Sequence, residues 1–191
     1  VSLYTEYPQE YFDTNHYGPF FSLVIAPFAL MPEWVGLLFW LIALSLSLFL
    51  ATRSLPIDYR KKVFIYWFCA HELLTALFMS QFNIAIAAII IATFYCIEKE
   101  KDICATLLIV IGTFVKLYGI VGLAFFFFSR HKTKFILSFI GWSAVCFVAP
   151  MLISSPEYII AQYQGWYESL AEKNGLNMFS QGQNVSILGL V

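Results

Sequence analysis

A single lysine inside a long apolar segment is the residue best suited to chemistry. Lys116 is the one charged residue between positions 103 and 129. A charged side chain in the middle of a bilayer costs about 2.5–3.5 kcal/mol on insertion scales, and such residues usually face a cavity or a partner. The Lys116 ammonium could bind a phosphate group as a point charge. Alternatively, it extends from a short helix to the lipid headgroups.

Two amides and an acidic pair are the other polar groups in apolar surroundings. Gln81 and Asn83 are two residues apart, so they would diverge on a helix, whereas at a turn both could contact one hydroxylated ligand. Equally, they could form hydrogen bonds between neighbouring helices. Glu72 follows His71, and the two could form an acid pair buried in the membrane. The simpler interpretation is that Glu72 is a local partner of Lys116.

Both ends of the chain mix aromatic residues with amides, carboxylates and histidine. Such surfaces suit sugar rings, and they are also typical of the aromatic belt at a membrane interface. The residues concerned are Tyr4, Tyr7, Tyr11, Phe12, His16 and Tyr17 near the start, and Tyr163, Trp166, Tyr167, Gln181, Gln183 and Asn184 near the end.

The composition indicates an integral membrane protein. The chain has 191 residues, of which 60% are hydrophobic and only 12% charged, with a net charge of −1. A soluble globular enzyme, a disordered chain and a basic nucleic-acid binder are excluded, because each needs many more charges. The four cysteines lie in or beside apolar runs without metal-ligand spacing, so we interpret them as small hydrophobic residues and expect no metal site.

Apolar runs between short charged segments predict an all-α, polytopic membrane bundle. Residues 33–52 and 135–153 each match one crossing. Residues 63–97 are too long for one crossing and fit two, with a turn near Ser80–Gln81. Residues 19–32 are too short to span and are interrupted by Pro27, which favours an interfacial or re-entrant segment.

The distribution of basic residues predicts that residues 103–129 form a hairpin. If the chain reverses near Lys116, the loops 53–62, 98–102 and 130–134 all lie on one side, which the positive-inside rule makes cytoplasmic. That side then holds Arg53, Arg60, Lys61, Lys62, Lys99, Lys101, Arg130, Lys132 and Lys134. Only Lys116 and Lys173 lie elsewhere.

The resulting organisation has three parts and about six crossings. Residues 1–32 form an extracytoplasmic loop with the interfacial segment, 33–153 the transmembrane bundle, and 154–191 a second extracytoplasmic loop. The polar residues of the bundle then gather toward the extracytoplasmic side. Because the sequence starts with Val1, we expect a fragment of a longer chain.

Several short motifs, in order, resemble the polyprenol-phosphate-mannose-dependent mannosyltransferases of glycosyltransferase family 87. Tyr17-Gly18-Pro19 with Pro27 and Pro32 is similar to the family's Y-x-P…P…P opening. Ser80-Gln81-Phe82-Asn83 stands where the family commonly has G-Q-x-N, and Lys116-Leu117-Tyr118 where it has K-x-Y-P. Ser80 replaces the usual glycine, and Gly119 the usual proline.

The resemblance implies a GT-C fold and an inverting transfer of a hexose, expected to be mannose. The donor would be a polyprenyl-phosphate sugar, and the acceptor would be a lipid or glycan outside the cytoplasm. The protein is expected in a bacterial inner membrane, with its active side extracytoplasmic. Lys116 would bind the donor phosphate with Tyr118, His16 or Tyr17 as supporting donors, and Gln81 and Asn83 would bind sugar hydroxyls. The family's catalytic aspartate is expected upstream of Val1, because Asp13 does not match its position. No cofactor is expected.

Two other functions remain open at this point. A lipid or solute transporter would also use broken helices and buried polar groups, but it should show inverted repeats and polar groups at both faces of the membrane. A non-catalytic membrane scaffold should pair its polar residues among themselves and leave no cavity.

Overall fold

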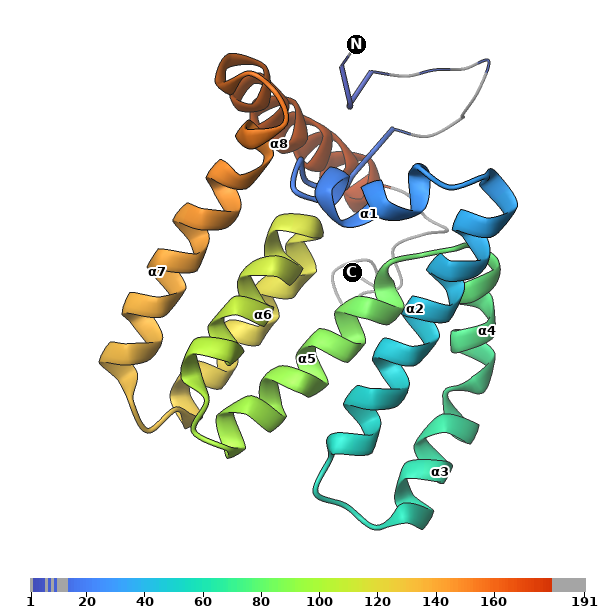
Figure 1. The fold of residues 1–191 in the computed structure, drawn as a ribbon, viewed down its shortest axis with the longest axis vertical. Helices are drawn as coiled ribbons and strands as arrows, with labels where there is room; N and C mark the ends of the chain where they lie inside the picture. The colour runs from blue at the N-terminus through green and yellow to red at the C-terminus, as the bar shows by residue number, and fades with distance from the viewer. Residues whose placement is uncertain (1, 6, 8, 10–13, 180–191) are drawn as a thin grey trace.

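The regular elements of the chain are helices throughout the part that the structure describes. The computed structural model describes residues 2–5, 7, 9 and 14–179 (Figure 1). The elements are α1 (Phe21–Ala29), α2 (Glu33–Ser54), α3 (Tyr59–Phe68), α4 (Ala70–Phe78), α5 (Asn83–Glu98), α6 (Asp102–Val115), the 3-10 helix η1 (Leu117–Phe128), α7 (Lys132–Val148), the 3-10 helix η2 (Ala149–Leu152) and α8 (Pro156–Phe179). The predicted all-α class is confirmed.

Two helices are long and apolar enough to cross a membrane. These are α2 and the continuous stretch Lys132–Leu152 formed by α7 and η2. Helices α5, α6 and η1 are apolar but shorter, with 16, 14 and 12 residues. The expected crossing before Ser80 is divided into α3 and α4 at Cys69. The prediction of about six crossings is therefore not confirmed.

The helices form a bundle whose upper end in Figure 1 is crossed by α1 and α8. Helix α5 packs between α2 and α6, and α7 packs on the other side of α6. One buried cluster joins Trp40 and Leu44 of α2 to Phe82, the start of α5 and Val115. A second joins Ile97, Ala105, Ile109 and Phe135 toward the opposite end.

Two end segments differ in detail from their predicted form. Helix α1 continues through Pro27, so this proline does not interrupt it. Within 154–191, the segment predicted as a loop, residues 156–179 form the long helix α8. Helix α8 packs against the start of the chain: the Leu3 amide donates to Gln162 Oε1 at 2.8 Å. The two end segments therefore lie at the same end of the bundle.

Residues 103–129 form a hairpin, as the charge distribution predicts. Helix α6 ends at Lys116, whose backbone is extended (φ −146°, ψ 121°), and η1 returns along α6. The two arms touch at glycine: a Cβ added to Gly119 would lie 2.2 Å from the Gly112 carbonyl carbon. Likewise, a Cβ on Gly122 would lie 2.8 Å from Ile109 Cγ1. This close approach allows the chain to reverse with Lys116 at the tip.

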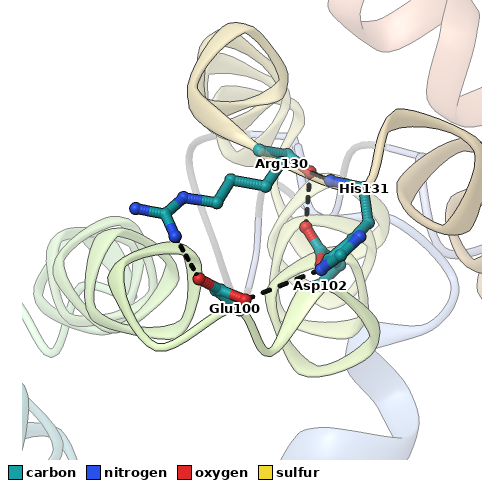
Figure 2. A network of polar contacts seen from close by, with 5 residues as sticks. Glu100, Asp102, Arg130 and His131 are labelled. Atoms are coloured by element: carbon teal, nitrogen blue, oxygen red, sulfur yellow. Dashed lines mark hydrogen bonds and ion pairs between the residues drawn. The ribbon is translucent and has the colours of Figure 1, made fainter.

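A polar network joins the helix ends at the other end of the bundle (Figure 2). The buried Asp102 accepts a hydrogen bond from the Ser129 hydroxyl at 2.5 Å, which links the start of α6 to the end of η1. Glu100 binds Arg130 at 2.6 Å and lies 3.6 Å from the His131 ring. The loops 98–102 and 130–134 are thus held together, and Figure 1 places the α2–α3 loop at this same end. The three basic loops share one end of the bundle.

The predicted turn near Ser80–Gln81 is present and has a specific geometry. Ser80 has a positive φ of 51°, the Ser80 amide donates to the Leu77 carbonyl, and the Gln81 amide donates to the Ala76 carbonyl. This pair of bonds is a Schellman motif, which ends α4 and normally has glycine at the left-handed position. The motif directs Gln81 away from the axis of α4 and starts α5 at Asn83.

Replacing Ser80 with glycine is expected to stabilise the protein by about 0.5–1 kcal/mol. An L-residue in the left-handed region carries a steric cost of about 1–2 kcal/mol, which glycine avoids while losing more backbone entropy on folding. Thermal unfolding of the purified protein in detergent measures the difference. Ser80→Ala is the control, because it removes the hydroxyl and keeps the Cβ. A glycine variant no more stable than the alanine variant would contradict the prediction.

Candidate functional site

The largest cavity described lies at the end of the bundle opposite the basic loops. Its volume is about 900 Å³. One wall is apolar, formed by Phe21, Ile25, Phe28, Ala29, Met31, Gly36, Leu37, Trp40 and Met79. Polar groups come from Thr14, Asn15, His16, Tyr17, Glu33, Ser80, Gln81 and Lys116. Five separate segments therefore meet here: residues 14–17, α1, the start of α2, the α4–α5 turn and the hairpin tip.

Lys116 reaches this cavity because the hairpin tip is fixed from the side. The Gly18 amide donates to the Val115 carbonyl at 3.0 Å, and a Cβ on Gly18 would lie 2.1 Å from the Phe114 carbonyl oxygen. Glycine at position 18 thus lets the N-terminal segment pack directly on the end of α6. The half-buried Lys116 then lies between this segment and the start of α5.

The Lys116 ammonium is held by an amide oxygen and two aromatic rings. Its Nζ donates to Asn83 Oδ1 at 2.7 Å and lies 5.4 Å from the centre of the Tyr17 ring and 5.3 Å from that of Tyr118. Each of these groups stabilises a cation without neutralising it. None of these three contacts is a carboxylate, so the ammonium can attract an anion in the cavity.

The expected pairing of Glu72 with Lys116 is wrong. Glu72 Oε1 lies 3.9 Å from His71 Nδ1, and both side chains are about nine-tenths exposed, at 88% and 91%. They lie on the outer surface of α4, where solvent or lipid headgroups can satisfy them. The partner of Glu72 is therefore its neighbour in sequence, His71, and not Lys116.

The two amides converge, as a turn would allow, and they bind each other. Asn83 Nδ2 donates to Gln81 Oε1 at 2.7 Å, while Asn83 Oδ1 accepts from Lys116. Gln81 lines the cavity, whereas Asn83 is outside its described lining. The arrangement therefore gives Gln81 a position to contact a ligand, with its NH₂ group as the donor, and gives Asn83 a supporting position behind it.

Tyr17 and Tyr118 flank the ammonium but differ in their access to the cavity. The Tyr17 hydroxyl accepts a long hydrogen bond from the Phe82 amide at 3.4 Å, and the Tyr17 ring stacks on Phe21. Tyr17 lines the cavity, whereas Tyr118 is 64% exposed and outside the described lining. Of these two, only Tyr17 is placed to touch a ligand in the cavity.

The segment that carries His16 and Tyr17 is anchored to neighbouring parts of the chain. The Tyr4 hydroxyl donates to the Tyr17 carbonyl at 2.8 Å, and burial raises the pKa of Tyr4, so this group remains a protonated donor. The Trp166 indole donates to the His16 carbonyl at 2.9 Å, and His16 Nδ1 lies 2.7 Å from the Ser169 hydroxyl. Helix α8 therefore supports one wall of the cavity.

Several residues of the site are not identified by the sequence patterns. Glu33 is the one carboxylate among the described lining residues, and its position after Pro32 signals only the start of a helix. Ser169 is a buried polar residue of helix α8, which lies in a segment predicted to be a loop. Of the residues singled out earlier, Tyr11, Phe12, Asp13, Gln181, Gln183 and Asn184 lie outside the described residues.

The combination of groups fits an amphiphilic molecule with an anionic, hydroxylated head. Lys116 supplies positive charge, Gln81 and His16 supply groups that bind hydroxyls, and the aromatic wall covers apolar carbon. In the described residues, no three His, Cys, Asp or Glu side chains come together in a way that could hold a metal ion.

Comparison with protein-family models gives one result that covers nearly all of the chain. The model of glycosyltransferase family 87 matches residues 15–191. Comparisons with curated proteins and with solved structures give no match. The matched family is the one that the motifs at Tyr17, Gln81 and Lys116 resemble, and the matched region includes all three.

Proposed function

Because the chain belongs to glycosyltransferase family 87, we propose that it transfers a hexose, expected to be mannose, from a polyprenyl-phosphate sugar to a lipid or glycan acceptor. The family indicates a glycosyltransferase; the donor, the sugar and the acceptor are our proposal. The observation that carries it is the Lys116 ammonium, which faces a cavity with an apolar wall. A lipid-linked phosphate sugar combines those same features.

In this mechanism, Lys116 stabilises the phosphate that leaves. As the acceptor hydroxyl attacks the anomeric carbon, the bond to the phosphate oxygen breaks and negative charge grows on the polyprenyl phosphate. A fixed cation close to that oxygen lowers the energy of the transition state, because it needs no reorganisation. Asn83 and the two tyrosines hold the ammonium in place.

The sugar and the acceptor are assigned to the remaining groups. Gln81 is proposed to bind sugar hydroxyls directly, and Asn83 to orient both Gln81 and Lys116. Inversion at the anomeric carbon requires a carboxylate that removes the proton of the acceptor hydroxyl. We propose that this base is the catalytic aspartate that the family resemblance implies.

We further propose that the cavity faces the extracytoplasmic side of a bacterial inner membrane. Support comes from the three basic loops, which share the opposite end of the bundle and hold nine of the eleven Lys and Arg residues. Short loops rich in these residues stay in the cytoplasm. Helix α2 and the stretch Lys132–Leu152 are suited to span the bilayer.

The test is a transfer assay with the full-length protein in proteoliposomes. With polyprenyl-phosphate mannose and a membrane acceptor extract, we expect radiolabelled mannose to appear in the acceptor and free polyprenyl phosphate to accumulate. The same assay with a nucleotide-linked mannose is expected to give no product. Movement of the intact lipid-linked sugar across the membrane, without cleavage, would instead identify a transporter and refute the proposed reaction.

A further inference from the structure

One carboxylate in the wall of the cavity has no role in the reaction proposed above. Glu33 is the first residue of α2 and lines the cavity. Three later residues of the same helix, Gly36, Leu37 and Trp40, also line it. Residues at this spacing lie on one face of an α-helix, so Glu33 is the polar member of an otherwise apolar wall. Among the residues that the structure describes, none forms a hydrogen bond or ion pair with its carboxylate.

Two contacts fix the position of this wall. A Cβ added to Gly36 would lie 2.2 Å from the Phe28 carbonyl oxygen, so α1 packs directly on the first turn of α2. The Trp40 indole donates a hydrogen bond to the Ser80 carbonyl at 3.2 Å, which joins the same face of α2 to the α4–α5 turn. Glu33 precedes Trp40 by roughly 10 Å along the helix axis. The start of α2 is therefore held at a set place beside the polar groups of the cavity.

The polar groups near the hairpin tip are hydrogen-bond donors. A lysine ammonium can only donate, so Lys116 Nζ requires the oxygen of the Asn83 amide, which it contacts at 2.7 Å. The Asn83 NH₂ group then donates to Gln81 Oε1, also at 2.7 Å, and this leaves the Gln81 NH₂ group for a ligand. Lys116 and Gln81 thus both present donors to the cavity, and a ligand atom that meets them must accept.

A hydroxylated ligand also needs acceptors, which these two groups do not supply. Each sugar hydroxyl has one proton to donate as well as lone pairs that accept. A carboxylate accepts at two oxygens, and hydrogen bonds to a charged acceptor are about twice as strong as neutral ones. Glu33 is the one carboxylate among the described lining residues. Its negative charge repels a phosphate, so the anionic and the hydroxylated parts of a ligand are directed to different groups.

We infer that Glu33 binds hydroxyl groups of the sugar carried by the lipid-linked donor. A sugar whose phosphate lies at Lys116 occupies the same cavity as Glu33, and its hydroxyls supply the protons that this carboxylate accepts. The inference rests on the proposed function for the identity of the ligand. The role is in binding, and the base that deprotonates the acceptor hydroxyl is a separate group. Glu33 thus favours the lipid phosphate that carries a sugar over the sugar-free product.

The affinities of two lipids separate this role from a structural one. The full-length protein in detergent is titrated with polyprenyl-phosphate mannose and with polyprenyl phosphate, and microscale thermophoresis gives each dissociation constant. For Glu33→Ala we expect the dissociation constant of the sugar-bearing lipid to rise about 10- to 100-fold, the usual effect of losing hydrogen bonds to a charged group. Glu33→Gln keeps a neutral acceptor oxygen and should show a smaller rise.

The sugar-free lipid is expected to respond differently. Both Glu33 variants should bind polyprenyl phosphate as tightly as the wild type or more tightly, because a negative charge that repels the phosphate is gone. Unchanged binding of the sugar-bearing lipid by Glu33→Ala would overturn the inference. An equal loss of affinity for both lipids would overturn it too, because it would show that the substitution damages the cavity as a whole.

Glu157 provides the matched control. It is an exposed carboxylate in the first turn of α8 and lies outside the described lining of the cavity. Glu157→Gln therefore removes the same charge from the same kind of position in a helix. Both lipids should bind this variant as they bind the wild type.

Kinetics of sugar transfer distinguish binding from catalysis. Glu33→Gln should raise KM for the donor with little change in kcat, the pattern of a lost binding interaction. A loss of kcat at unchanged KM would identify Glu33 as the base and overturn the binding role. A protein that binds the sugar-bearing lipid through Glu33 but transfers no sugar would refute the proposed function and leave the inference intact. A wild-type protein that binds neither lipid would refute both.

Discussion

Replacing Lys116 with alanine is expected to lower kcat/KM for sugar transfer about 100- to 1,000-fold, the usual effect of losing one preorganised group that stabilises transition-state charge. The Lys116 ammonium is held at 2.7 Å from Asn83 and between two aromatic rings, so no described neighbour can move into its place without leaving its own contacts. The measurement is initial-rate kinetics with the lipid-linked donor in proteoliposomes.

Two matched variants make this result specific. Lys134→Ala also removes one positive charge, but at the opposite end of the bundle, and should transfer sugar at the wild-type rate. Lys116→Arg keeps the charge in a larger, planar group and should retain part of the activity. Wild-type kinetics for Lys116→Ala would remove the phosphate-binding role and with it the proposed mechanism.

The largest effect on stability is expected from Gly119. An alanine Cβ at this position would lie 2.2 Å from the Gly112 carbonyl carbon and 2.3 Å from the Thr113 nitrogen. These are backbone atoms of α6 and cannot rotate away, so the two arms of the hairpin must separate. Overpacking of this kind typically costs 1–3 kcal/mol and occasionally more, and we expect at least about 3 kcal/mol because backbone must move.

Gly141 provides the control for this substitution. It lies in α7, and an added Cβ would meet nothing within 4 Å. Gly141→Ala should therefore stabilise the protein by about 0.5–1 kcal/mol through the better helix propensity of alanine. Thermal unfolding in detergent compares both variants with the wild type. A Gly119→Ala protein that unfolds at the wild-type temperature would show that the arms are not in contact.

Charge was the most informative signal for the fold. The hairpin at Lys116 is not visible in hydropathy, because residues 103–129 read as one apolar run, but the positions of the basic loops require the chain to reverse. The turn at Ser80–Gln81 was predictable because the apolar run 63–97 is too long for one crossing. By contrast, the prediction of about six crossings is not confirmed, because an apolar run gives its composition and not the length of each helix within it.

The candidate site was partly predictable for a related reason. Lys116 and Gln81 stand out because polar groups are expensive in apolar segments, and both line the cavity, as do the predicted His16 and Tyr17. Glu33 and Ser169 carry no such signal, since each lies in a polar or helix-start context where its type is ordinary. Their roles depend on contacts across the fold: Ser169 meets His16 from the other end of the sequence.

The two arms of the hairpin differ in length, with fourteen residues in α6 and twelve in η1, yet the residue after η1 bonds the first residue of α6. The 3-10 winding of η1 accounts for this. A 3-10 helix rises about 2.0 Å per residue, so the twelve residues of η1 extend roughly 24 Å. The fourteen residues of α6 extend roughly 21 Å at 1.5 Å per residue. Wound as an α-helix, the same twelve residues would extend only roughly 18 Å and stop short of Asp102. The greater rise per residue of the 3-10 helix thus lets the arm with fewer residues extend at least as far as α6, so that Ser129 can bond Asp102 where α6 starts.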